Sequence, residues 1–181
     1  MKKIFLTFML IFSVSALYTQ NKIALTKNDF QFSVGDGIFH MITANKSNLF
    51  AQPSLSFNYF YSIQKWFWLG GTLNFCHISS YGGNRGPDYV DSEKTKEKYS
   101  PTNFFGLAPT VRFSYINRPN FILYSGTTLG VGCYFQSSKK QFVPFIQETF
   151  IGFSSGKKFY FGAELGAGFR GILNGNIGYR F

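Results

Sequence analysis

The C-terminal segment Gly171–Phe181 alternates apolar and polar residues with a period of two. Its apolar positions are Leu173, Ile177, Tyr179 and Phe181, and its polar positions are Asn174, Asn176 and Arg180. Successive side chains of a β-strand point to opposite faces, so this period predicts a strand with one apolar and one polar face. A chain built from such strands must bring every apolar face against the same kind of surroundings.

The same alternation recurs in seven earlier segments, each at least eleven residues long. These predicted strands are Asp29–Met41, Pro53–Ile63, Trp66–Tyr81, Thr102–Tyr115, Phe121–Gln136, Phe142–Phe153 and Lys158–Arg170. No segment between them has a helical period. The sequence therefore predicts an all-β, eight-stranded, antiparallel, up-and-down barrel.

The composition of the polar face indicates which side of the barrel is buried. It consists mainly of Ser, Thr, Asn and Gly, and only 14% of the chain is charged, whereas aromatic residues reach 20%. A soluble domain carries about 25% charged residues. Small neutral polar side chains suit a narrow interior, and a broad aromatic face suits lipid. We therefore expect a transmembrane barrel.

A soluble, lipocalin-like barrel that binds a ligand in an apolar interior is the competing architecture. It requires the apolar face to point inward, and Phe57, Leu129 and Phe161 are the residues whose direction decides between the two. Inward side chains at these positions would favour the soluble barrel, and outward ones would exclude it.

The lengths of the connections agree with a membrane barrel. The turns at Gln64–Lys65, Asn117–Asn120 and Ser154–Lys157 are short, whereas the alternate connections include the two longest, Thr43–Gln52 and Gly82–Pro101. With both termini in the periplasm, the short turns lie inside and the long loops outside, as in outer-membrane barrels.

The N-terminus has the pattern of a secretory signal peptide. Lys2 and Lys3 precede the apolar run Ile4–Val14, which is too short to span a membrane, and small residues follow. We expect residues 1–20 to be this signal and residues 21–181 to be the barrel. Removal of the two lysines lowers the formal charge from +10 to +8. For an exported protein, anionic lipid is a more plausible counterpart than nucleic acid.

The closing region Gly156–Phe181, GKKFYFGAELGAGFRGILNGNIGYRF, resembles the outer membrane protein β-barrel domain family of Bacteroidetes-type bacteria. Its final residues resemble the signal that the barrel-assembly machinery reads, with matches at Asn174, Tyr179 and Phe181. Asn176 stands where Gly is usual. The resemblance implies a monomeric protein of the cell outer membrane, with outer-membrane lipids and the assembly machinery as partners.

Five charged residues are expected to point into the barrel, where an unpaired charge is costly. They are Arg112, Glu148, Glu164, Arg170 and Arg180. We predict that they form a paired network in which Glu164 contacts Arg170, Arg180 or Lys158. By the same alternation, Cys76 faces inward and Cys133 outward, so no disulfide is expected between them.

His77 and Ser79 share a face near the outer end of their predicted strand. Their spacing resembles that of outer-membrane lipid A deacylases, in which His activates Ser and an acidic residue orients the His. The flanking predicted strands hold no acidic residue. The pair is thus a candidate catalytic site for an alternative function as a lipid A-modifying enzyme.

The remaining motifs predict no cofactor and no metal. Gly166–Gly171 fits the dinucleotide fingerprint, but it lies within a strand and a second strand follows it, whereas the fingerprint needs a helix. We therefore expect a non-enzymatic protein with a structural or surface-contact role through its extracellular loops. The longest polar segment, Gly82–Pro101, is the candidate contact region.

Overall fold

The computed structural model describes residues 26–38, 49–51, 53–80, 102–136 and 139–181. The expected signal peptide and the Gly82–Pro101 segment lie outside the described residues. The described strands are β1 (Asn28–Gly35), β2 (Leu49–Ala51), β3 (Ser54–Gln64), β4 (Phe67–Ser80), β5 (Thr102–Arg118), β6 (Phe121–Gln136), β7 (Lys139–Gly156), β8 (Phe159–Gly168) and β9 (Leu173–Arg180).

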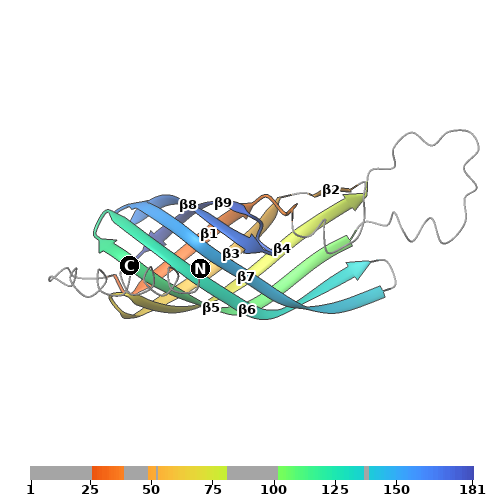
Figure 1. Ribbon diagram of the computed structural model, residues 1–181, viewed down its shortest axis with the longest axis horizontal. Coiled ribbons are helices and arrows are strands. Elements are labelled where there is room, and N and C mark those ends of the chain that lie inside the picture. Colours follow the sequence, from red (N-terminus) through yellow and green to blue (C-terminus); the bar gives the residue numbers. More distant parts are fainter. Residues whose placement is uncertain (1–25, 39–48, 52, 81–101, 137–138) are drawn as a thin grey trace, which may run out of the picture.

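Eight of these strands form a closed antiparallel barrel (Figure 1). Each long strand pairs with the next in the chain, and β1 pairs with β9 to complete the ring. The predicted eight-stranded, up-and-down topology is confirmed. The short strand β2 was not predicted, and it adds to the edge of β4 at Ile78–Ser80.

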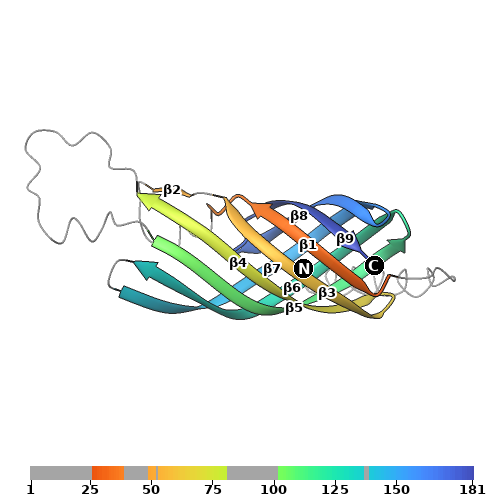
Figure 2. The same ribbon diagram turned by 180° about the vertical axis from the view of Figure 1, so that it is seen from behind.

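The two ends of the barrel differ. The turns after Gln64, Arg118 and Gly156 lie at the end where the first and last strands meet, which we call the terminal end. There the Asn28 amide donates to the Phe181 carbonyl at 3.0 Å. At the opposite, distal end, β8 finishes at Gly168 beside Gln147, whereas β7 extends further, to Lys139. Strands β4–β7 therefore project beyond β8, β9 and β1 (Figures 1 and 2).

The barrel is apolar outside and polar inside. The deciding residues Phe57, Leu129 and Phe161 are 62%, 60% and 64% exposed, whereas Ser, Thr, Asn and Gln side chains on the alternate positions are buried. This excludes the lipocalin-like alternative, because a soluble barrel would hide its aromatic face. An apolar exterior around a hydrogen-bonded interior is the organisation of a transmembrane β-barrel. No helix in the described part of the chain is long and apolar enough to cross a membrane.

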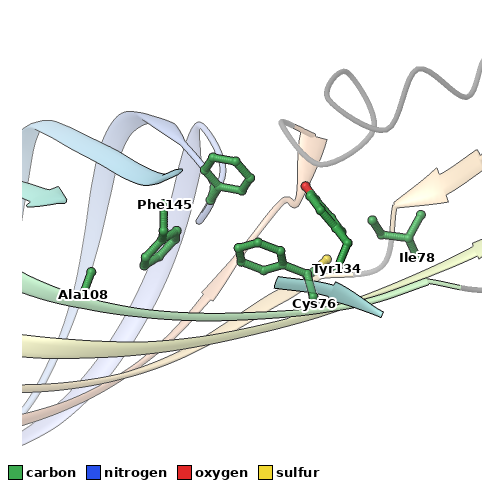
Figure 3. Close-up of a cluster of buried hydrophobic side chains, with 7 residues drawn as sticks. Cys76, Ile78, Ala108, Tyr134 and Phe145 are labelled. Atoms are coloured by element: carbon green, nitrogen blue, oxygen red, sulfur yellow. The ribbon is translucent and has the colours of Figure 1, made fainter. Parts of the chain in front are cut away.

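The interior also contains aromatic clusters that alternation did not predict. Seven buried residues gather toward the distal half (Figure 3): Cys76, Ile78, Phe104, Ala108, Tyr134, Phe145 and Phe169. A second cluster, nearer the terminal end, contains Phe60, Trp68, Ile122 and Tyr124. In strands such as β5, Phe104 points inward and Phe105 outward, so both faces are apolar and the period of two disappears from the sequence.

The β8–β9 turn corrects two expectations from the sequence. Strand β8 stops at Gly168, where φ is +136°, and Gly171 also has a positive φ of +107°. Phe169 shares the parity of Phe161 and would face lipid in a continuous strand, but it turns inward and stacks on Phe104 with ring centroids 5.1 Å apart. The Asp36 carboxylate holds the turn by accepting the backbone amides of Ile172 and Leu173. The first strand consequently ends at Gly35 rather than continuing through Asp36.

Candidate functional site

Charged side chains near the terminal end form the first half of an interior network. Asp29, on β1, is fully buried, and its Oδ2 lies 3.0 Å from Arg112 Nη1 and 3.9 Å from Arg180 Nε. Its Oδ1 accepts the Tyr160 hydroxyl at 2.5 Å. One carboxylate thus serves two guanidinium groups that come from β5 and β9. Arg112 also donates to Gln31.

Aromatic rings enclose the two arginines of this half. The Arg112 guanidinium lies 3.7 Å from the Phe60 ring centroid and 4.2 Å from that of Tyr124. Arg180 lies 4.0 Å from the Tyr160 centroid. A cation over an aromatic face is attracted by the ring quadrupole, more strongly when both are desolvated. The rings therefore offset part of the cost of burying these charges.

Glu164, on β8, is the centre of the second half. Its Oε2 lies 2.6 Å from Arg170 Nη2, which is the pairing expected first from the sequence. Its Oε1 accepts the Tyr124 hydroxyl at 2.7 Å and the Gln31 amide at 2.9 Å. Arg180, the second expected partner, contacts Asp29 instead. Gln31 joins the two halves, because it contacts both Arg112 and Glu164.

These contacts cross the barrel and fill it. Tyr124 on β6 reaches Glu164 on β8, and Arg112 on β5 reaches Asp29 on β1. A chain of hydroxyl groups continues across the wall, from Thr72 to Thr110 at 2.7 Å and on to Thr128 at 2.9 Å. An eight-stranded barrel is only wide enough for its own side chains. These side chains fill the interior, so the barrel is better suited to a closed, rigid structure than to a diffusion pore.

Glu148 is not part of this network, so the expectation that it points inward is wrong. It alternates with Gln147 and Thr149, which are buried, and it accepts the Thr127 hydroxyl at 2.6 Å. Both residues therefore belong to the outer face. A β-bulge between Thr149 and Ile151 shifts the alternation of β7 along its length, which the sequence pattern did not reveal.

Sequence reasoning missed Asp29, Tyr124 and Tyr160 as members of the network. Asp29 could have been assigned inward, because it shares the parity of Gln31 and Ser33 in the first strand. Tyr160 shares the parity of Glu164 and Tyr124 that of Thr128, so alternation places both tyrosines inside, but it does not tell which charged group each one meets. Only the approach of opposite walls shows that their hydroxyl groups meet Glu164 and Asp29.

The structure describes one side chain of the candidate catalytic pair, that of His77. His77 is half-buried on the outer face, and its Nδ1 lies 2.6 Å from Asn103 Oδ1 on β5. The side chain of Ser79 is outside the described residues. Among the described residues no carboxylate is paired with His77, and no group of three or more His, Cys, Asp or Glu side chains could hold a metal ion.

The cysteines are both free. Cys76 belongs to the inner aromatic cluster, whereas Cys133 lies on the outer side between its paired neighbours Phe105 and Phe142. The strand wall separates the two sulfur atoms. The expectation of no disulfide is confirmed.

The residues matched to the assembly signal lie on both faces of β9. Asn174 is buried in the interior, and Tyr179 and Phe181 lie outside. The two aromatic rings continue a row that crosses the terminal end from Phe159 through Tyr179 and Phe181 to Phe30, with centroid distances of 4.7, 5.8 and 5.8 Å. Aromatic girdles of this kind lie at membrane interfaces.

Comparison with known proteins gives only structural matches of low similarity. Neither protein-family models nor curated proteins give a match. Two matched structures are of Ail, the attachment invasion locus protein of Yersinia pestis, one of them in complex with the heparin analogue sucrose octasulfate. They are 11% and 13% identical, with TM-scores of 0.40 and 0.41, and each match covers 86% of this chain and 97% of the other. A likeness at this level carries no inference about activity.

Proposed function

We propose that this protein is a non-enzymatic barrel of the bacterial outer membrane, with a structural or surface-contact role through its extracellular loops. The observation that carries the proposal is the shape of the distal end. Strands β4–β7 project beyond β8 and β9, and residues 81–101 connect β4 to β5 at the top of this projection. A rigid, plugged barrel then serves as the support for the polar segment that joins the distal ends of β4 and β5.

The same proposal includes the route to the membrane. The expected signal peptide directs export, and the C-terminal strand with Asn174, Tyr179 and Phe181 presents the signal to the barrel-assembly machinery. The closed ring supports a monomer, because β1 and β9 satisfy each other and leave no seam for a second copy. Outer-membrane lipids surround the apolar exterior, and nucleic acid is not a partner.

The contact role is tested by replacing Gly82–Pro101 with a short Gly/Ser turn. Strands β4 and β5 pair from Phe67–Phe113 to Ile78–Thr102, so the barrel is expected to assemble normally without the segment. Cells that display the intact protein should be retained on protein-coated surfaces more than cells that display the shortened one. The amounts of the two proteins on the cell surface are matched by measuring how much of an added epitope tag is accessible to external protease. Equal retention of the two would contradict the contact role.

The alternative, lipid A modification, is retained because Asn103 orients His77 on the outer face. An orienting amide can replace the acidic member of a catalytic triad. The non-enzymatic proposal expects identical lipid A acyl patterns, by mass spectrometry, in cells expressing the wild type, His77→Ala or no barrel. Loss of an acyl chain that depends on His77 would replace the first proposal with the second.

A further inference from the structure

The membrane-facing side of β3–β7 carries a groove that runs across the strands. Two neighbouring rows of outward side chains form its walls, and paired residues make up each row. One row contains Leu73, Leu107 and Val131, and the other contains Phe75, Phe105 and Phe142. Between the rows lies a hollow of about 420 Å³. This volume is in the range of small-molecule sites, about 300–1,000 Å³.

The shape of the groove suits an alkyl chain. Residues on the same face of a strand are about 7 Å apart, and methylene groups pack at about 3.5–4 Å from their neighbours, so one chain fits between the rows. The floor is made by Asn74, Gly106 and Gly132, whose side-chain positions face the interior. Only their backbone borders the groove, and its polar groups are used in the strand ladders.

A polar row borders the groove on its distal side. His77, Asn103, Phe135 and Lys140 pair in sequence across β4–β7. His77 and Asn103 are hydrogen-bonded, and the Lys140 ammonium lies 5.9 Å from the Phe135 ring centroid. Lys140 is exposed, and no acidic residue in the described parts of β4–β6 shares its row. Positive charge thus stands where the apolar wall ends.

The opposite side of the barrel lacks this combination. At the distal end of β8 and β9, the Arg170 guanidinium is buried inside the barrel, and the Asp36 carboxylate accepts the backbone amides of Ile172 and Leu173. An anionic headgroup would be repelled there and attracted at Lys140. Among the residues that the structure describes, the apolar groove and the cationic border therefore coincide on the β4–β7 side.

We propose that this groove holds one acyl chain of a phosphate-bearing lipid from the leaflet at the distal end, with the phosphate at Lys140 and the His77–Asn103 pair. The occupant that we propose is a glycerophospholipid, the class to which the probe phosphatidylglycerol belongs. The site requires the membrane location of the barrel but does not require the surface-contact role. The lipid site can therefore fail while the contact role holds, and the contact role can fail while the lipid site holds.

Native mass spectrometry of the full, folded barrel in detergent, with phosphatidylglycerol as the probe, tests the proposal. The wild type should retain one lipid. Leu107→Trp fills the groove and should abolish retention. Lys140→Glu should weaken retention at least about fivefold, because each basic residue near an anionic surface contributes about 1 kcal/mol. Ile177→Trp is the matched control, since Ile177 and Leu107 are 61% and 60% exposed on opposite sides. It should bind like the wild type.

Several results would contradict the proposed lipid site. Equal loss in Leu107→Trp and Ile177→Trp would mean general lipid association. If diacylglycerol, which lacks phosphate, is retained equally well, the proposed headgroup contact is wrong. If inorganic phosphate displaces the lipid, the proposed acyl-chain contact is wrong. Heat-dependent electrophoretic mobility reports folding of each variant. If Leu107→Trp does not fold, the retention measured for Lys140→Glu decides.

Discussion

Asp29→Asn is expected to lower the free energy of unfolding by about 3–5 kcal/mol, the cost of removing one partner from a buried ion pair. The side chain keeps its size but loses its charge. Arg112 and Arg180 then share no carboxylate, although both remain buried at 3% and 2% exposure. The tyrosine that donates to Asp29, Tyr160, also loses its charged acceptor. Denaturant titration of the folded barrel, followed by tryptophan fluorescence, measures the change.

Two variants make this result specific. Glu148→Gln neutralises a carboxylate on the outer face and should cost less than about 1 kcal/mol, because Thr127 is its hydrogen-bond partner and no guanidinium depends on it. Arg112→Met in the Asp29→Asn background removes one unpaired buried charge and should recover part of the lost free energy of unfolding. An Asp29→Asn barrel as stable as the wild type would contradict the interior network.

Ile177→Arg is expected to lower stability in a lipid bilayer by about 2–4 kcal/mol, the cost of Arg on the lipid face near the middle of a barrel strand. Ile177 is central in β9 and 61% exposed on the apolar exterior. A guanidinium at this depth has no water and no paired carboxylate. The measurement is reversible unfolding from vesicles at low pH or in denaturant.

Depth supplies the control for this second prediction. Phe159→Arg, in the neighbouring strand, changes a residue of greater exposure, 79%, at the terminal end of β8. Near the interface the same substitution costs about 0–1 kcal/mol, because the long side chain reaches water. Equal effects at the two positions, or a stable Ile177→Arg barrel, would argue against a membrane-spanning exterior.

Most of the architecture was predictable because lipid imposes one rule on every strand. A period of two, an aromatic face and a neutral polar face recur along the chain, and together they indicate strand number, direction and which face is outside. The prediction failed where the rule is locally relaxed. The bulge in β7 turned Glu148 outward, and the glycines at 168 and 171 turned Phe169 inward. Neither change alters the composition of the segment.

By itself, the sequence determined a lipid-facing barrel with a hydrogen-bonded interior, because alternation and composition are properties of single strands. The tertiary structure alone decided which interior groups meet. Asp29 with two arginines, Tyr124 with Glu164, and the aromatic cluster around Phe104 join strands that are far apart in the chain. The groove on β3–β7 likewise exists only when rows from five strands are brought into register. The interior contacts depend on closure of the ring, because no local pattern encodes the distance across it, and the groove depends on the register of neighbouring strands.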